Sequence, residues 1–104
     1  MASEGYHEDE SKLRPETKDM HRAIVSLMEE LEAVDWYNQR IDACEDETLA
    51  RILAHNRDEE KEHAAMVLEW IRRKDPSMDE NLREYLFSDT KLDEELEETG
   101  HGAG

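Results

Sequence analysis

A carboxylate and an imidazole lie together on the apolar face of one predicted helix. On a helical projection Glu60 falls between Leu53 and Val67, near the centre of the apolar stripe. His63 follows three residues later on the same side. A buried carboxylate without a partner is costly or takes up a proton, whereas a bound cation removes that cost. The spacing Glu-x-x-His therefore predicts a metal-binding pair.

The preceding helix offers a second carboxylate, Glu30, at the edge of its own apolar stripe beside Leu27 and Val34. Tyr37 lies further along the same edge. Ferritin-like di-iron bundles take one Glu from each of two helices and Glu-x-x-His from each of the other two. One copy of this chain holds half of that set, and a two-fold dimer would supply ligands for two metals. Mixed carboxylate and imidazole ligands with open positions suit iron and oxygen chemistry.

The same pattern has alternative explanations. A helix this rich in charge produces Glu-x-x-His by chance, and Arg57 lies on the same side as a competing partner for Glu60. In that case Glu30 is a boundary residue and the chain is a metal-free helical adaptor. Another alternative is a helical dimer with a purely structural metal site. The presence of carboxylates on the apolar faces of both helices favours metal binding.

A separate polar group on the first helix consists of Glu29, Glu32 and Trp36, which project away from the main stripe. One interpretation is an exposed acidic face with an aromatic side chain packed at an oligomer contact. The other is a site that captures cations and leads toward Glu30. The projection alone favours the exposed face.

Three helices position these residues, and the periodicity predicts them over Pro15 to Cys44, Asp46 to Lys74 and Asp79 to Phe87. The fold class is therefore all-α, an antiparallel two-helix hairpin plus a short C-terminal helix within residues 12–88. A lone hairpin leaves part of each apolar stripe uncovered, so we expect it to dimerise into a ferritin-like four-helix bundle. Residues 1–11 are expected to be a disordered tail and residues 89–104 an acidic flexible tail.

Composition narrows the possible partners of these 104 residues. The formal net charge of -16, from 29 acidic and 13 basic residues, argues against binding to nucleic acid or anionic membranes. The single cysteine, Cys44, forms no internal disulfide. No apolar run approaches the roughly 20 residues of a membrane span, and no secretory signal is visible. The expected location is cytoplasmic.

The segments that carry the predicted site resemble the encapsulated ferritins. They are residues 21–37 (HRAIVSLMEELEAVDWY) and 52–66 (ILAHNRDEEKEHAAM), and the later 68–73 (LEWIRR) and 82–87 (LREYLF) also match. The resemblance covers about residues 12–88. It implies a two-helix ferroxidase that assembles as a ring-shaped decamer, built from five dimers. Two irons would bind at each dimer interface through Glu30, Glu60 and His63 of both chains.

The resemblance also assigns roles to the second polar group. Glu29 and Glu32 match metal-uptake carboxylates with Trp36 beside them, and calcium or other divalent cations can bind there. Tyr37 matches a tyrosine near the iron. These assignments reverse the preference given by the projection.

The resemblance further implies a location inside an encapsulin shell, which holds the mineral and is reached through a C-terminal docking peptide. After Phe87 the sequence shows an acidic stretch and a glycine-rich end, with no recognisable apolar and basic docking peptide.

Overall fold

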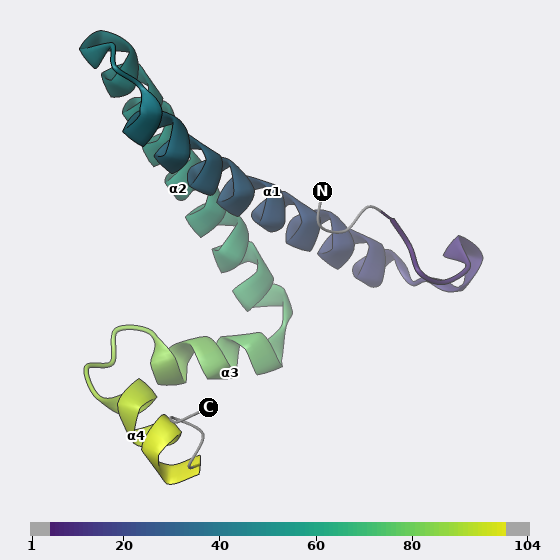
Figure 1. Cartoon of the computed structure of the whole chain (residues 1–104). Helices are drawn as coiled ribbons and strands as arrows, with labels where there is room; N and C mark the ends of the chain where they lie inside the picture. Colours follow the sequence, from purple (N-terminus) through teal and green to yellow (C-terminus); the bar gives the residue numbers. More distant parts are fainter. Residues whose placement is uncertain (1–4, 100–104) are drawn as a thin grey trace. The chain divides into compact units, whose positions relative to one another are not determined.

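The computed structural model describes residues 5–99, and all of the regular structure in this range is helical. A single 3-10 turn, η1 (Glu10–Lys12), precedes the helices α1 (Pro15–Ala43), α2 (Glu47–Lys74), α3 (Pro76–Tyr85) and α4 (Lys91–Thr99) (Figure 1). The chain divides into two compact units, one ending at Ile71 and the other beginning at Arg72. This division falls inside the segment 12–88 that was expected to form one helical domain.

The first unit contains the predicted antiparallel hairpin, in which α1 and α2 run side by side (Figure 1). Pro15 suits the first turn of α1 because its fixed φ is already helical and its missing N–H needs no partner. At the start of α2 the carboxylate of Asp46 accepts a hydrogen bond of 2.8 Å from the backbone N–H of Leu49. Only residues 44–46 connect the two helices. This short connection restricts which residues of α1 can face which residues of α2.

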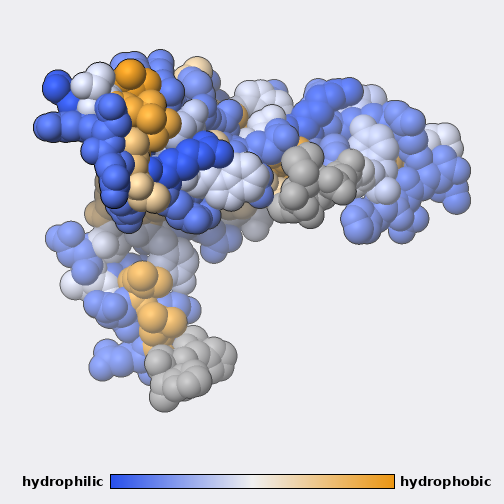
Figure 2. All heavy atoms as spheres, turned by 45° about the horizontal axis from the view of Figure 1, so that its top comes forward, coloured by the Kyte–Doolittle hydropathy of each residue, from blue (hydrophilic) through white to orange (hydrophobic). Residues whose placement is uncertain are grey.

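The hairpin has very little interior of its own. Among the described residues only Ala64 and Ile71 are buried. Large apolar side chains remain in contact with solvent, including Met66 at 65% exposure, Leu31 at 55% and Ile52 at 52%. The face drawn in Figure 2 is mostly hydrophilic, with apolar side chains gathered in separate patches. Within the described residues, no helix is long and apolar enough to cross a membrane.

The N-terminal segment differs from the expected disordered tail. Residues 5–9 lead into η1, which Asp9 caps by accepting a 2.9 Å hydrogen bond from the backbone N–H of Ser11. The ring of Tyr6 lies 5.0 Å from that of His21 on α1. The expectation of disorder rested only on the lack of periodicity, whereas these residues form a capped 3-10 turn and an aromatic contact in the structure. Residues 1–4 lie outside the described range.

In the second unit, α3 begins earlier than predicted. The carboxylate of Asp75 accepts a 3.0 Å hydrogen bond from the backbone N–H of Met78, so Asp75 caps α3 while Pro76 takes its first position. The same Asp-Pro pair thus ends α2 and starts α3. The helix ends at Tyr85, short of the predicted Phe87, which has a φ of 60° and a fully exposed side chain.

The helix α4 was not predicted, since the sequence analysis assigned residues 89–104 to a flexible tail. Ser88 starts it by accepting a 3.0 Å hydrogen bond from the backbone N–H of Lys91. The ammonium of Lys91 lies 3.3 Å from the carboxylate of Glu84 on α3, and the two helices contact each other. Leu92 and Leu96 are one turn apart, a helical spacing that the surrounding acidic residues obscured. The remainder of the predicted tail, residues 100–104, lies outside the described range.

Candidate metal centre

The three residues predicted to bind metal come together between the two long helices. Glu30 is supplied by α1, and Glu60 and His63 are supplied by α2. Each offers one ligand atom, and these atoms all lie within 4.8 Å of one another. Ala64, which follows His63, is buried.

The imidazole lies at the same distance from both carboxylates. Its Nδ1 atom lies 3.6 Å from Oε2 of Glu30 and 3.6 Å from Oε2 of Glu60. These distances are too long for hydrogen bonds. They match the separation of about 3 to 4 Å between two atoms that bind one metal at about 2.1 Å. His63 is half exposed, whereas the two carboxylates are about three-quarters covered. One side of the cluster is therefore open to a cation and to small molecules.

The charges within the cluster are poorly compensated. Oε2 of Glu30 is buried and has no hydrogen-bond partner. The neighbouring carboxyl of Glu60 raises the pKa of Glu30 above its ordinary value, and burial adds to this effect, while His63 opposes it. A cation bound here would relieve both the repulsion between the two carboxylates and the missing hydrogen bond of Glu30. The donor set of two carboxylates and one imidazole fits iron.

Arg57, the alternative partner considered for Glu60, is engaged elsewhere. Its Nη1–H donates a hydrogen bond of 3.1 Å to Oδ1 of Asn38 on α1, and its Nε–H donates one of 3.1 Å to Oδ1 of Asp58. Within residues 5–99, the charged group that lies within ion-pair distance of Glu60 is His63. The explanation of the carboxylates as partners of arginine is therefore wrong for Glu60.

Comparison with known proteins identifies the relatives of this fold and site. The sequence matches the EncFtn-like family over residues 5–89. An encapsulated ferritin-like protein from Rhodospirillum rubrum is 56% identical over 106 residues, which cover 100% of this chain and 76% of that protein.

The chain belongs to the EncFtn-like family of encapsulated ferritins. A crystal structure of a Nitrosomonas europaea protein is 66% identical and superimposes with a TM-score of 0.81, covering 84% of this chain and 96% of that one. An encapsulin nanocompartment cargo protein from Myxococcus xanthus is 40% identical over 67 residues, which cover 64% of this chain and 52% of that protein. The resemblance inferred from the sequence and the all-helical fold class are confirmed.

The second polar group of this EncFtn-like chain is less compact than the first. Glu29 is exposed, Glu32 is half-buried and Trp36 is 49% exposed. Within residues 5–99 of one chain, the three-ligand cluster that the structure forms is the one at Glu30, and it includes neither Glu29 nor Glu32.

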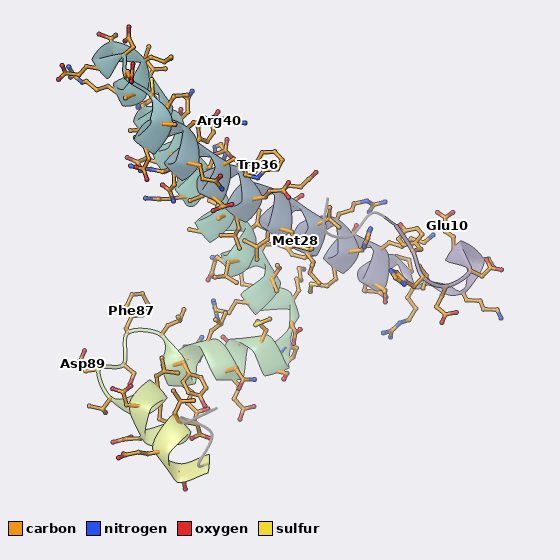
Figure 3. The ribbon with its side chains drawn as sticks, viewed as in Figure 1. Glu10, Met28, Trp36, Arg40, Phe87 and Asp89 are labelled. Carbon is orange, nitrogen blue, oxygen red and sulfur yellow. The ribbon has the colours of Figure 1, made fainter. Side chains whose placement is uncertain are left out.

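Arg40 lies beside this group and was not among the residues predicted from the sequence. Its guanidinium lies 5.3 Å from the centre of the Tyr37 ring and 6.0 Å from that of Trp36. Figure 3 shows Trp36 and Arg40 projecting from the same side of α1. The signal was present in the sequence, because residues three and four apart are neighbours on a helix. Arg40 covers both aromatic rings through cation–π contacts.

The raised pKa of Glu30 predicts how the metal-free EncFtn-like chain responds to pH. A carboxyl whose folded-state pKa is raised stabilises the fold fully below its unfolded-state pKa, and that stability is lost as pH rises through the folded-state value. Glu30→Gln keeps the shape and removes the charge. We expect its melting temperature to exceed the parent's by a few degrees near pH 8, with no gain near about pH 4.

Calorimetry in the presence of a chelator measures this difference, with Glu62→Gln on the exposed face of α2 as the matched control. If the melting temperatures of Glu30→Gln and the parent differ by the same amount at every pH, the repulsion between the two carboxyls is contradicted.

Proposed function

We propose that this protein is a ferroxidase that oxidises Fe(II) to Fe(III) at a di-iron centre shared by two copies of the chain. The observation that carries the proposal is the buried Oε2 atom of Glu30, which has no hydrogen-bond partner and faces Glu60 and His63. Iron is the substrate of this reaction, and oxygen is the acceptor.

The ligand chemistry favours the ferric product. Anionic carboxylate oxygens are hard ligands and stabilise Fe(III) more than Fe(II). Each Fe(II) gives up one electron, so two irons bound side by side supply an electron pair to oxygen. Glu30 and Glu60 would bridge and orient the irons, and His63 would complete the ligand set of each. The half exposure of His63 leaves oxygen a route to the site.

A second copy is required because one chain supplies only three ligands. Two copies related by a two-fold axis would supply four carboxylates and two imidazoles, as in ferritin-like bundles. The small interior supports pairing independently of the metal, since only Ala64 and Ile71 are buried among residues 5–99. We extend the proposal to the ring-shaped decamer, a pentamer of dimers, that the family resemblance implies.

The names of the relatives guide the proposal for a partner and a location. The Rhodospirillum rubrum protein is described as an encapsulated ferritin-like protein, and the Myxococcus xanthus protein as an encapsulin nanocompartment cargo protein. We propose an encapsulin shell as the partner of this chain, within the cytoplasm. The shell would store the ferric mineral that a two-helix protein has no room to hold.

The catalytic assignment predicts the effect of removing each ligand. In anaerobically loaded protein exposed to air, Glu30→Ala, Glu60→Ala and His63→Ala should each slow Fe(II) oxidation on the order of 10-fold or more, because each removes one ligand from both irons. Ferric absorbance and oxygen consumption measure the rate. Glu62→Ala, on the exposed face of α2, is the matched control and should oxidise iron at the parent rate. If all three ligand variants oxidise Fe(II) at the same rate as the parent, the assignment of this centre is wrong.

The shared centre predicts that metal drives association. Fe(II) added without oxygen should shift the parent toward dimers and larger rings, because the ions bridge ligands from two chains. Light scattering with and without iron measures the mass distribution. Glu60→Ala should lose the shift although its apolar surfaces are intact. Identical distributions of the parent in both conditions would contradict the coupling between metal and assembly.

For the outer group we propose that Glu29 and Glu32, with Trp36 beside them, capture Fe(II) before it reaches Glu30. Calcium or other divalent cations can occupy the same carboxylates. Tyr37 is proposed to lie near the di-iron centre of the assembled protein.

Glu32→Ala should then change the rate of oxidation severalfold while the centre still binds two irons per dimer. Stopped-flow absorbance measures the rate, and metal analysis measures the occupancy. The exposed Glu59, replaced by Ala, is the control for loss of one acidic charge. Unchanged kinetics in Glu32→Ala would return this group to the status of a solvated acidic face.

A further inference from the structure

The arginine closest in sequence to the centre makes two side-chain hydrogen bonds, and neither is to a residue of the centre. Arg57 precedes Glu60 by one helical turn, so the two side chains start from neighbouring positions on α2. Its Nη1–H reaches across the hairpin to Oδ1 of Asn38 at 3.1 Å, and its Nε–H bonds Oδ1 of Asp58 at 3.1 Å. The side chain is only 24% exposed, so this arrangement is a packed one.

A guanidinium in this position is the obvious internal counter-ion for the carboxylates. Arginine pairs with carboxylates in a two-pronged geometry that is stronger than an ordinary hydrogen bond. Glu60 is three residues from Arg57 on α2, a spacing at which helical side chains are neighbours. The adjacent Glu30 has an oxygen without a hydrogen-bond partner. An arginine that turned toward Glu60 would satisfy the carboxylates and occupy the place of a cation.

We propose that Asn38 and Asp58 are positioning residues that hold the guanidinium of Arg57 away from Glu60 and so keep the metal site free of an internal cation. The inference rests on the proposed function, because it explains why the carboxylates stay available to iron.

The two positioning residues act from different helices. Asn38 supplies a neutral oxygen from α1, which ties the orientation of Arg57 to the packing of the hairpin. Asp58 supplies a charged oxygen from α2, and its pKa is lowered chiefly by the hydrogen bond from Arg57. Asp58 also lies 3.5 Å from the ammonium of Lys61. Removal of Asn38 alone leaves the bond to Asp58, so both must be replaced to free the arginine.

The test uses Co(II), which binds oxygen and nitrogen ligands and gives a visible spectrum. We expect Asn38→Ala/Asp58→Ala to bind Co(II) on the order of 10-fold more weakly than the parent by calorimetry, because the released guanidinium competes for Glu60. Glu62→Ala measures the general effect of losing one acidic charge on α2. It should weaken binding less than the double variant does.

Removing the arginine distinguishes positioning from a structural role. Arg57→Gln should raise Co(II) affinity far more in the double variant than in the parent, and it should restore the parent's Co(II) spectrum. If Asn38 and Asp58 only fasten the two helices together, the triple variant will bind as weakly as the double variant. If Arg57→Gln changes Co(II) affinity equally in the parent and in the double variant, the inference is overturned.

A metal-free measurement separates this inference from the proposed function. The carboxyl carbon-13 signal of Glu60 should shift in Asn38→Ala/Asp58→Ala and return when Arg57→Gln is added, whereas that of Glu62 should not move. An unchanged Glu60 signal would overturn the positioning role even in a protein that binds metal. A parent protein that binds no Co(II) would overturn the metal site alone, since the carboxyl signals still report where Arg57 lies.

Discussion

The contact of Glu30 with Glu60 across the hairpin is the interaction on which the other features depend. Two carboxyls of adjacent helices face each other where both are mostly covered, and the pKa of Glu30 rises as a result. Such a pair opposes the association of α1 with α2 unless a proton or a cation lies between them. The packing of the hairpin and the occupancy of the site are therefore one equilibrium, in which binding a cation also strengthens the contact between the helices.

The small amount of buried apolar surface makes the stability of the hairpin sensitive to whether a cation is bound. With only Ala64 and Ile71 buried among residues 5–99, the hairpin has little apolar packing to offset the repulsion between its carboxyls. In the dimer proposed above, a second copy would cover apolar surface that one copy leaves exposed and would bring the missing ligands at the same time. Apolar burial and metal ligation then favour the same assembly, which gives a short chain two independent sources of stability.

The sequence predicted those parts of the fold that depend on periodicity and end signals. The apolar stripes located α1 and α2 to within a residue or two and singled out Glu30, Glu60 and His63 as polar residues on apolar faces. It failed where a contact between segments decides the structure. The helix α4 depends on α3, and the position of Arg57 depends on Asn38, which lies on the other long helix. Neither of these contacts produces a periodic pattern of apolar residues in the sequence.

The positions of the arginines show why a strongly acidic protein can keep a cation site open. Carboxylates far outnumber basic side chains here, so each arginine has several possible partners and its rotamer decides which acid is neutralised. Arg57 is committed to Asn38 and Asp58, and Arg40 lies over aromatic rings. Because neither of these arginines neutralises the partly buried carboxylates of Glu30 and Glu60, a metal ion can do so instead. Affinity for a cation at this centre therefore depends on the neighbours of the arginines as much as on the ligands themselves.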